Sequence, residues 1–344
     1  MEKLSFIFNQ RRDFNIGRYI IFVCIVLMLI TGCGKISESS EPEVFSLPTV
    51  ASNIEEIVPA EPSEVPRITT PDIKPTLSQA TITPTVIIES PLTIGYTMVS
   101  EVDEMQLLYI PAGRFIMGSN QGDSNEKPFH EVYLDAFWMD KFEVTHDQYK
   151  LCVADRACTA PTDISFYNNS SFKNHPVVNI NWSQAKAYCQ WAGRDLPSEA
   201  QWEKAARGDD ERKYPWGDNY PTSDYANLCD LGCASGSKLE NFSDGYSQTA
   251  PVGNFPMGSS PYEVHDMAGN VWEWVNDWYA EDYYGSQREW ANPSGPMTGE
   301  EKVLRGGAWD NSERFIRSTN RGWGSPEVFG EDLGFRCALS VESP

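Results

Sequence analysis

The sequence predicts one globular domain that mixes short β-strands with a few helices, preceded by a long segment unable to form a core. The chain has 344 residues, which suffices for one large domain with appendages or for two ordinary domains. It contains eleven Trp, fifteen Tyr and sixteen Phe, and most of them lie after residue 95. Strand-like apolar runs and helix-capping residues begin only after residue 104. We therefore expect the folded domain over residues 101–344.

Three extended runs open this domain. Residues 107–111 read as a strand that ends at Pro111, and residues 113–118 are expected to be its hairpin partner. Residues 132–139 form a third run rich in apolar and aromatic side chains. These runs predict that the domain begins with β-structure.

Capping residues mark the helices that follow. Thr145 can cap a short helix that continues through Lys150. Capping boxes precede two longer helices, expected at 184–192 and 199–207. The boxes are Asn181 with Gln184 and Ser198 with Gln201, and the closing glycines are Gly193 and Gly208. Beyond residue 208 Gly, Pro, Asn, Asp and aromatic residues predominate, which favours long ordered loops that need disulfides or metals as staples.

The N-terminus has the pattern of an export signal. Basic residues precede an apolar run at 19–30, which is shorter than the roughly 20 residues that span a membrane. The run leads into Leu-Ile-Thr-Gly-Cys, ending at Cys33, which resembles a bacterial lipobox. Residues 1–32 are thus predicted to be a lipoprotein signal peptide, with Cys33 as the lipidated residue. The alternative is an uncleaved signal anchor with an incidental Cys.

Residues 33–100 are rich in Pro, Ser, Thr and Glu and are predicted to be a disordered linker, because they offer little apolar surface to bury. A lipid anchor followed by a linker predicts a domain in the cell envelope, held outside the cytoplasm on a membrane. The net charge of -22 excludes nucleic acid as an expected partner, since phosphate binding requires clustered Lys and Arg.

Six cysteines follow Cys33, and an even number in an exported domain predicts three disulfides out of fifteen possible pairings. Proximity favours Cys152 with Cys158 and Cys229 with Cys233, which leaves Cys189 with Cys337. The alternative is that one short pair consists of free thiols or clips a metal. Zinc is disfavoured, because a Cys-x3-Cys pair lacking a nearby His or second pair is a poor zinc site.

Several motifs together resemble the formylglycine-generating enzyme (sulfatase-modifying factor) family. They include Asp-Met-Ala-Gly-Asn-Val-Trp-Glu-Trp at 266–274 and Leu-Gly-Phe-Arg-Cys at 333–337. Further stretches that fit lie at 110–119, 144–149, 175–208, 214–217, 249–252 and 303–307. The resemblance implies an α+β fold of low regular secondary structure, related to C-type-lectin-like domains. It also implies a family disulfide between Cys189 and Cys337.

The same resemblance implies two structural calcium ions. The first would be held by the side chains of Asn227 and Asp244 and the carbonyls of Leu228 and Tyr246. The second would be held by the side chains of Asp266 and Glu273 and the carbonyls of Gly269 and Val271. These oxygen ligands suit a hard cation. The alternative is that the Asp and Asn side chains only cap loops.

The resemblance does not extend to the catalytic cysteines of the family enzyme. The family enzyme binds copper(I) through two cysteines five residues apart, just after a Gly-Gly-Ser motif, because this soft ion requires thiolates. The two positions are Asn311 and Ile316 here, and the motif Ser is Ala308. No Cys lies between Cys233 and Cys337, so a shifted alignment cannot restore the pair. Copper binding and oxidation of a substrate cysteine are therefore not expected.

A binding function remains possible without the thiolates. The resemblance places Trp272, Trp309, Asn311, Arg314, Arg317 and Arg321 around the family's substrate groove. Arg and Trp side chains can bind a peptide, protein or glycan by stacking and paired hydrogen bonds. The alternative is that the Trp residues belong to the core and the Arg residues to structural ion pairs. Two other functions stay open: an oxidase that reuses the pocket, and a structural module of the envelope.

The lipobox yields the first testable prediction. Replacing Cys33 by Ala should move the protein from the membrane fraction to the soluble fraction and abolish its labelling by an alkyne fatty acid, because the thiol that carries the lipid is lost. Cys24→Ala, which alters a Cys inside the signal, is the matched control and should change neither result. Labelling that persists in Cys33→Ala would refute the anchor.

Overall fold

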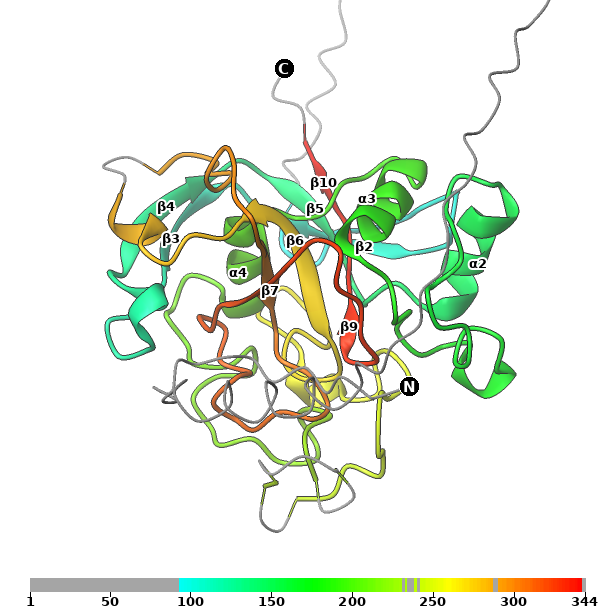
Figure 1. Ribbon diagram of the computed structural model, residues 1–344. Coiled ribbons are helices and arrows are strands. Elements are labelled where there is room, and N and C mark those ends of the chain that lie inside the picture. Colours follow the sequence, from blue (N-terminus) through cyan, green and yellow to red (C-terminus); the bar gives the residue numbers. More distant parts are fainter. Residues whose placement is uncertain (1–92, 231–232, 234–237, 240–241, 287–289, 342–344) are drawn as a thin grey trace, which may run out of the picture. The chain divides into compact units, whose positions relative to one another are not determined.

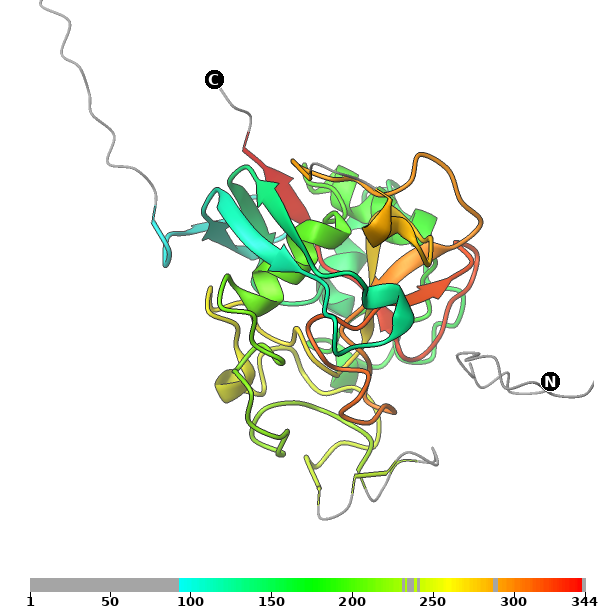
Figure 2. The same ribbon diagram turned by 90° about the vertical axis from the view of Figure 1, so that its left-hand side faces the viewer.

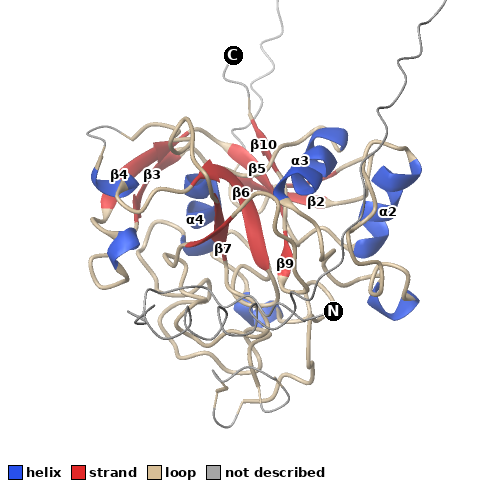
Figure 3. Ribbon diagram, in the orientation of Figure 1, coloured by secondary structure: helices blue, strands red, loops and turns tan. Residues whose placement is uncertain are grey.

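The computed structural model describes residues 93–341, except 231–232, 234–237, 240–241 and 287–289. The predicted signal peptide, Cys33 and nearly all of the predicted linker lie outside the described residues. The described chain mixes short helices and strands with long ordered loops, as Figures 1 and 3 show. None of its helices has the length and apolar character required to traverse a lipid bilayer.

The first sheet has four antiparallel strands in the order β1-β2-β5-β10. They are β1 (Thr97–Val99), β2 (Gln106–Ile110), β5 (Phe137–Asp140) and β10 (Ala338–Ser340). Strand β1 lies inside the segment expected to be linker, so the domain starts earlier than residue 101. The Thr, Met and Val of this strand favour a pleated conformation, and Met98 pairs with Leu107 of β2.

The expected hairpin of 107–111 with 113–118 is wrong. Strand β3 (Gly113–Met117) instead pairs with β4 (His130–Leu134), and the free edge of β2 is occupied by β5. The run 132–139 was expected to be continuous, but it splits between β4 and β5. The split falls at Asp135, whose backbone N–H donates to Asn292 Oδ1 at 2.8 Å rather than to a neighbouring strand.

A second four-stranded sheet has the order β8-β7-β6-β9. Its strands are β6 (Trp272–Trp278), β7 (Lys302–Arg305), β8 (Gly322–Gly324) and β9 (Leu333–Gly334). The sequence had predicted only loops here, and that expectation is wrong for these strands. Most residues of β6 and all of β7 are buried, so neither strand shows the apolar–polar alternation that marks a half-exposed strand.

The three helices begin where the sequence predicted them. They are α2 (His146–Ala154), α3 (Trp182–Trp191) and α4 (Glu199–Arg207), and each has a capping box at its N-terminus. Both closing glycines have positive φ, 74° at Gly193 and 73° at Gly208. Helix α2 continues past Lys150 because its last turn buries Cys152 against the core.

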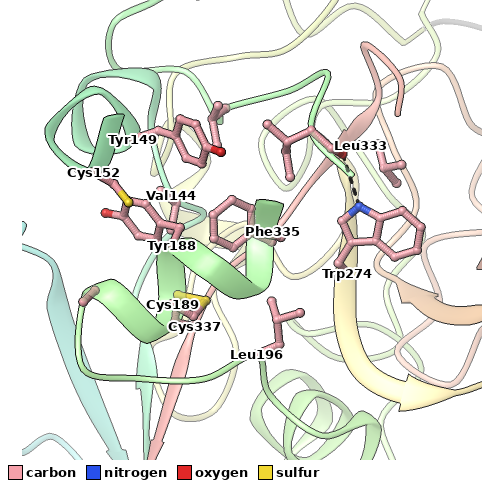
Figure 4. Close-up of a cluster of buried hydrophobic side chains, with 14 of the residues drawn as sticks. Val144, Tyr149, Cys152, Tyr188, Cys189, Leu196, Trp274, Leu333, Phe335 and Cys337 are labelled. Atoms are coloured by element: carbon pink, nitrogen blue, oxygen red, sulfur yellow. Dashed lines mark hydrogen bonds between the residues drawn. A yellow bond between two sulfur atoms is a disulfide. The ribbon is translucent and has the colours of Figure 1, made fainter. Parts of the chain in front are cut away.

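A cluster of buried side chains ties α2 and α3 to the C-terminal strands (Figure 4). The rings of Tyr149 and Tyr188 stack at 5.6 Å, and the edge of Phe335 packs against Tyr188 at 5.5 Å. The Cys189–Cys337 disulfide lies beside them. The other two predicted disulfides, Cys152–Cys158 and Cys229–Cys233, are also present, so the pairing inferred from proximity is confirmed.

Seen after a quarter turn, the long loops between α4 and β6 lie together below the sheets (Figure 2). The loop that follows β7 reaches the same region. These loops carry most of the residues that the sequence singled out as a site.

Candidate functional site

A cavity of about 690 Å³ opens beside the loop of residues 118–123 that follows β3. Its other wall comes from the loop after β7, through Arg314, Arg317 and Thr319. The cations that line it are Arg207, Lys213, Arg314 and Arg317, and the anions are Asp123, Glu211 and Asp218. The lining is thus nearly balanced in charge, although the chain as a whole is strongly acidic.

Ion pairs hold the two walls together. Arg317 donates to Glu126 Oε1 at 2.7 Å and to Glu126 Oε2 at 2.8 Å, and Glu126 is fully buried. Arg314 donates to Asp123 Oδ1 at 2.7 Å, but 47% of its side chain remains exposed. Thr319 completes the joint by donating its hydroxyl to Glu126 Oε2 at 2.7 Å. A ligand in the cavity could therefore reach the guanidinium of Arg314.

Only part of the predicted groove lines this cavity. Trp272 is 1% exposed and belongs to the core cluster, so it is not a groove residue. Arg321 is 3% exposed and forms a two-point ion pair with Glu199, with donor–acceptor distances of 2.7 and 3.0 Å. Trp272 therefore packs in the core and Arg321 forms a structural ion pair, which is the alternative to a role in the groove. Trp309 is half-buried and donates from Nε1 to the carbonyl of Glu331 at 3.2 Å.

The residues of the first predicted calcium site come together. Asp244 accepts from the N–H groups of Leu228 and Tyr246, each at 2.9 Å, so the two backbone segments face one carboxylate. Burial raises the pKa of Asp244 to about 6, and nearby Asp230 adds to the effect. Asn227 is 1% exposed, and its Oδ1 has no hydrogen-bond partner in the described structure. A buried amide oxygen without a donor fits a cation ligand.

The second predicted site fits less well at Glu273. Both carboxylate oxygens of Glu273 accept hydrogen bonds from Arg336 at 2.7 Å, and Oε2 also accepts from Trp202 Nε1 at 2.8 Å. Asp266 is held by a different contact, because its Oδ2 accepts from the N–H of Gly253 at 2.6 Å. Burial raises the pKa of Asp266 to about 6. The carboxylate of Glu273 therefore serves first as the partner of a buried guanidinium.

Glu143 and Asn270 are two members of this region that sequence reasoning missed. Glu143 is fully buried, and its Oε2 accepts from Asn270 Nδ2 at 2.8 Å while its Oε1 has no partner in the described structure. Burial and the charges of Asp266 and Glu273 raise the pKa of Glu143 well above its usual range. Its only sequence signal was an isolated acid between Phe142 and Val144.

Across the described ranges, no group of three or more His, Cys, Asp or Glu side chains is arranged to hold a metal ion. Calcium sites built from one or two carboxylates with amide and carbonyl oxygens do not require such a group. The donor set at Asn227 thus suits a hard cation and not a soft one.

The two positions that should carry copper cysteines have other roles. Asn311 closes a turn, because its Oδ1 accepts from the N–H of Ala308 at 3.1 Å and its own N–H donates back to the Ala308 carbonyl at 3.0 Å. Ile316 is fully buried in an apolar cluster with Leu228 and Tyr214. Gly307 packs so closely that a Cβ on it would lie 2.8 Å from Ile316 Cγ2.

The sequence profile of the "Sulfatase-modifying factor enzyme 1-like domain" family matches residues 96–341. The chain belongs to this family. The match covers the three sheets and the three α-helices of the described residues and the cavity, and its start agrees with the first strand, β1.

Relatives that are named for different activities are similar to this chain. A serine/threonine-protein kinase pkn1 of Chlamydia caviae is 33% identical over 69% of this chain, which spans 38% of the kinase's length. The formylglycine-generating enzyme of Thermomonospora curvata is 32% identical over 67% of this chain and 92% of the enzyme. The inactive Cα-formylglycine-generating enzyme 2 of Mus musculus is 27% identical over 78% of this chain and 96% of its own length.

Among solved structures, PvdO from Pseudomonas aeruginosa is similar, with a TM-score of 0.60 and 26% identity. The match covers 73% of this chain and all of PvdO. The family fold expected from the motifs is thus confirmed. At the positions that the resemblance assigns to the copper cysteines, this chain has a hydrogen-bonded turn at Asn311 and a buried apolar side chain at Ile316.

The role of Ile316 as a packing residue can be tested by stability. Ile316→Ala should lower the free energy of unfolding by about 2–5 kcal/mol, because it leaves a cavity in a fully buried cluster. Asn311→Ala, at the other lost cysteine position, should cost only about 1 kcal/mol, the contribution of a turn hydrogen bond. Urea denaturation measures both. Equal and small losses would mean that Ile316 lines an open site.

Proposed function

We propose that this protein is an exported, lipid-anchored, non-catalytic binding domain that holds a peptide, protein or glycan in the cavity between residues 118–123 and 314–319. The observation that carries the proposal is that Asn311 and Ile316, at the positions that the resemblance assigns to copper cysteines, make structural contacts, while residues of the same loop line a polar cavity. The relative from Mus musculus supports the proposal, because it is named as an inactive formylglycine-generating enzyme. The predicted lipobox at Cys33 supports the location.

The chemistry of the cavity favours a polar ligand. Its lining is more polar than apolar, and Phe129, 49% exposed, provides an aromatic face at its edge. Arg314 can donate to a carbonyl, carboxylate or hydroxyl while it keeps its contact with Asp123. Because the charges of the lining nearly cancel, recognition would depend on hydrogen bonds and shape more than on net charge.

We also propose that calcium stabilises the domain at the two regions around Asn227 and Asp266. Support comes from the unpartnered Asn227 Oδ1 and from three buried carboxylates that face a single guanidinium, that of Arg336. Buried charges without a partner cost several kcal/mol each, and a divalent cation would remove that cost. The cation would supply positive charge and would take no part in a reaction.

Removing calcium should therefore lower the melting temperature of the full chain. A cation present at 100 times its dissociation constant adds about 2.7 kcal/mol for each site, so chelation with EGTA should lower Tm by about 10 °C or more. Differential scanning calorimetry measures the shift, and added calcium should restore the original Tm. Magnesium at the same concentration is the control, because it tolerates such irregular carbonyl sites poorly. A Tm that does not respond to EGTA would refute the calcium sites.

The binding function predicts two results for the purified chain. With copper(I), reductant and oxygen, a Cys-x-Pro-x-Arg peptide should yield no aldehyde by mass spectrometry, whereas an active family enzyme should convert it.

Ligands selected from a displayed peptide library and a glycan array should bind Arg314→Ala with about tenfold or more lower affinity than the wild type, because a donor in the cavity is lost. Arg114→Ala removes a similarly exposed ion pair, with Glu131, outside the cavity and should bind normally.

Aldehyde formation would instead support the oxidase, since catalysis would then not need the cysteine pair. Failure to select any ligand, together with self-association of the chain in sedimentation experiments, would favour the structural envelope module.

A further inference from the structure

One buried side chain, Asn270, bonds to residues of both proposed cation regions. It is 2% exposed, and its Oδ1 accepts from Asn227 Nδ2 at 3.1 Å and from the N–H of Ala250 at 2.8 Å. On the other side, its Nδ2 donates to Glu143 Oε2 at 2.8 Å. A single planar amide thus touches Asn227 in the first region and Glu143 beside the second.

At the first region Asn270 fixes which way the amide of Asn227 points. The oxygen of Asn270 can only accept, so Asn227 must present its NH2 group there, and the same group also donates to the carbonyl of Gln248 at 2.9 Å. Asn227 Oδ1 is consequently turned to the opposite side, where the described structure provides no donor. This is the orientation that a cation ligand needs.

At the second region Asn270 holds one oxygen of Glu143 and leaves the other without a partner. Asp266 and Glu273 are the carboxylates whose charges act on Glu143, and among the described residues the guanidinium of Arg336 acts on all three. Because Arg336 is bound in two-point fashion by Glu273, the charges of Glu143 and Asp266 are left without a comparable partner. Glu143 is thus better placed than Glu273 to ligate a cation beside Asp266.

The backbone joins the two regions as closely as the side chains do. The N–H of Asn270 donates to the carbonyl of Asn227 at 3.0 Å. Gly269 has a φ of +80°, and a Cβ on it would lie 2.3 Å from that same carbonyl oxygen. A shift of either segment therefore moves ligand atoms of both sites.

We propose that Asn270 is a positioning residue that couples the two cation sites, so that calcium binds to them cooperatively through Asn227 Oδ1 and Glu143 Oε1. The first cation orders the network that the second cation requires, and a polarised chain of hydrogen bonds strengthens each of its members. The inference rests on the calcium sites proposed above and extends them by naming Glu143 as a ligand and Asn270 as the link between the sites.

The test is a calcium titration of the calcium-depleted full chain by isothermal calorimetry, in the wild type and in Asn270→Gly. Glycine accepts the positive φ of 62° at this position, so the variant removes the side chain without straining the backbone. The matched control is Asn179→Gly, since Asn179 is also buried, has a φ of 61°, and has a side-chain NH2 without a partner in the described structure.

The wild type and Asn179→Gly should each bind two calcium ions cooperatively. Asn270→Gly should weaken both binding steps by about fivefold or more and should bind the ions independently, as expected for a loss of coupling. Equal affinities in the wild type and Asn270→Gly, or independent binding in the wild type, would overturn the coupling and leave the two sites standing. A wild type that binds no calcium would overturn the sites themselves.

Glu143→Gln covers the case in which Asn270→Gly does not fold. Gln keeps the shape of Glu143 and can still accept from Asn270, but it lacks the charge that would hold the second cation. It should weaken the second step most and remove the cooperativity, whereas Glu131→Gln, at an exposed position of β4, should leave both steps unchanged. Cooperative binding that survives in Glu143→Gln would refute the role of Glu143.

Discussion

The buried pair of Glu273 and Arg336 is the contact on which the rest of the domain depends. Glu273 lies on β6 and also accepts from Trp202 of α4, so one carboxylate joins the second sheet, a helix and the C-terminal segment. Arg336 donates further to the carbonyls of Asp140, at the end of β5, and His265. Removing one partner of such a pair costs about 3–5 kcal/mol, because the other charge stays buried. The Cys189–Cys337 disulfide anchors the residue that follows Arg336 to helix α3.

A second set of buried ion pairs extends this frame to the cavity. Glu203 of α4 accepts from Arg305 of β7 at 2.6 Å, and Arg305 also donates to three carbonyls of residues 318–320. Glu126 then fixes Arg317 and Thr319 in the same loop. A loop without regular secondary structure is thus held at both ends by fully buried charges. This explains how an irregular segment can form one wall of a cavity.

Local signals in the sequence predicted well those features that local bonds determine. The capping boxes at Asn181 and Ser198 located α3 and α4, because a cap is a contact between residues three apart. Pairing of β3 with β4 and the buried strand β6 depend on distant partners, so no short pattern indicated them. Similarly, the resemblance singled out Asn227 and Asp266, whereas the contact of Glu143 with Asn270 joins residues 127 apart in the chain, so no local pattern indicated it. The burial of Trp272 and Arg321 was likewise decided by tertiary packing.

Asn311 and Ile316, at the positions that the resemblance assigns to the copper cysteines, both support the loop after β7. Asn311 retains the turn through its own side chain, and Ile316 adds apolar contact with Leu228, a residue of the first proposed calcium region. By contrast, the ion pairs at Glu273 and Glu126 are buried, and a change at either one would leave an uncompensated charge. Stability therefore constrains the carboxylate network and both walls of the cavity, including the loop after β7 that carries Asn311 and Ile316. A loop fixed in this way can form the wall of a polar cavity without the thiolates that the family enzyme needs for its chemistry.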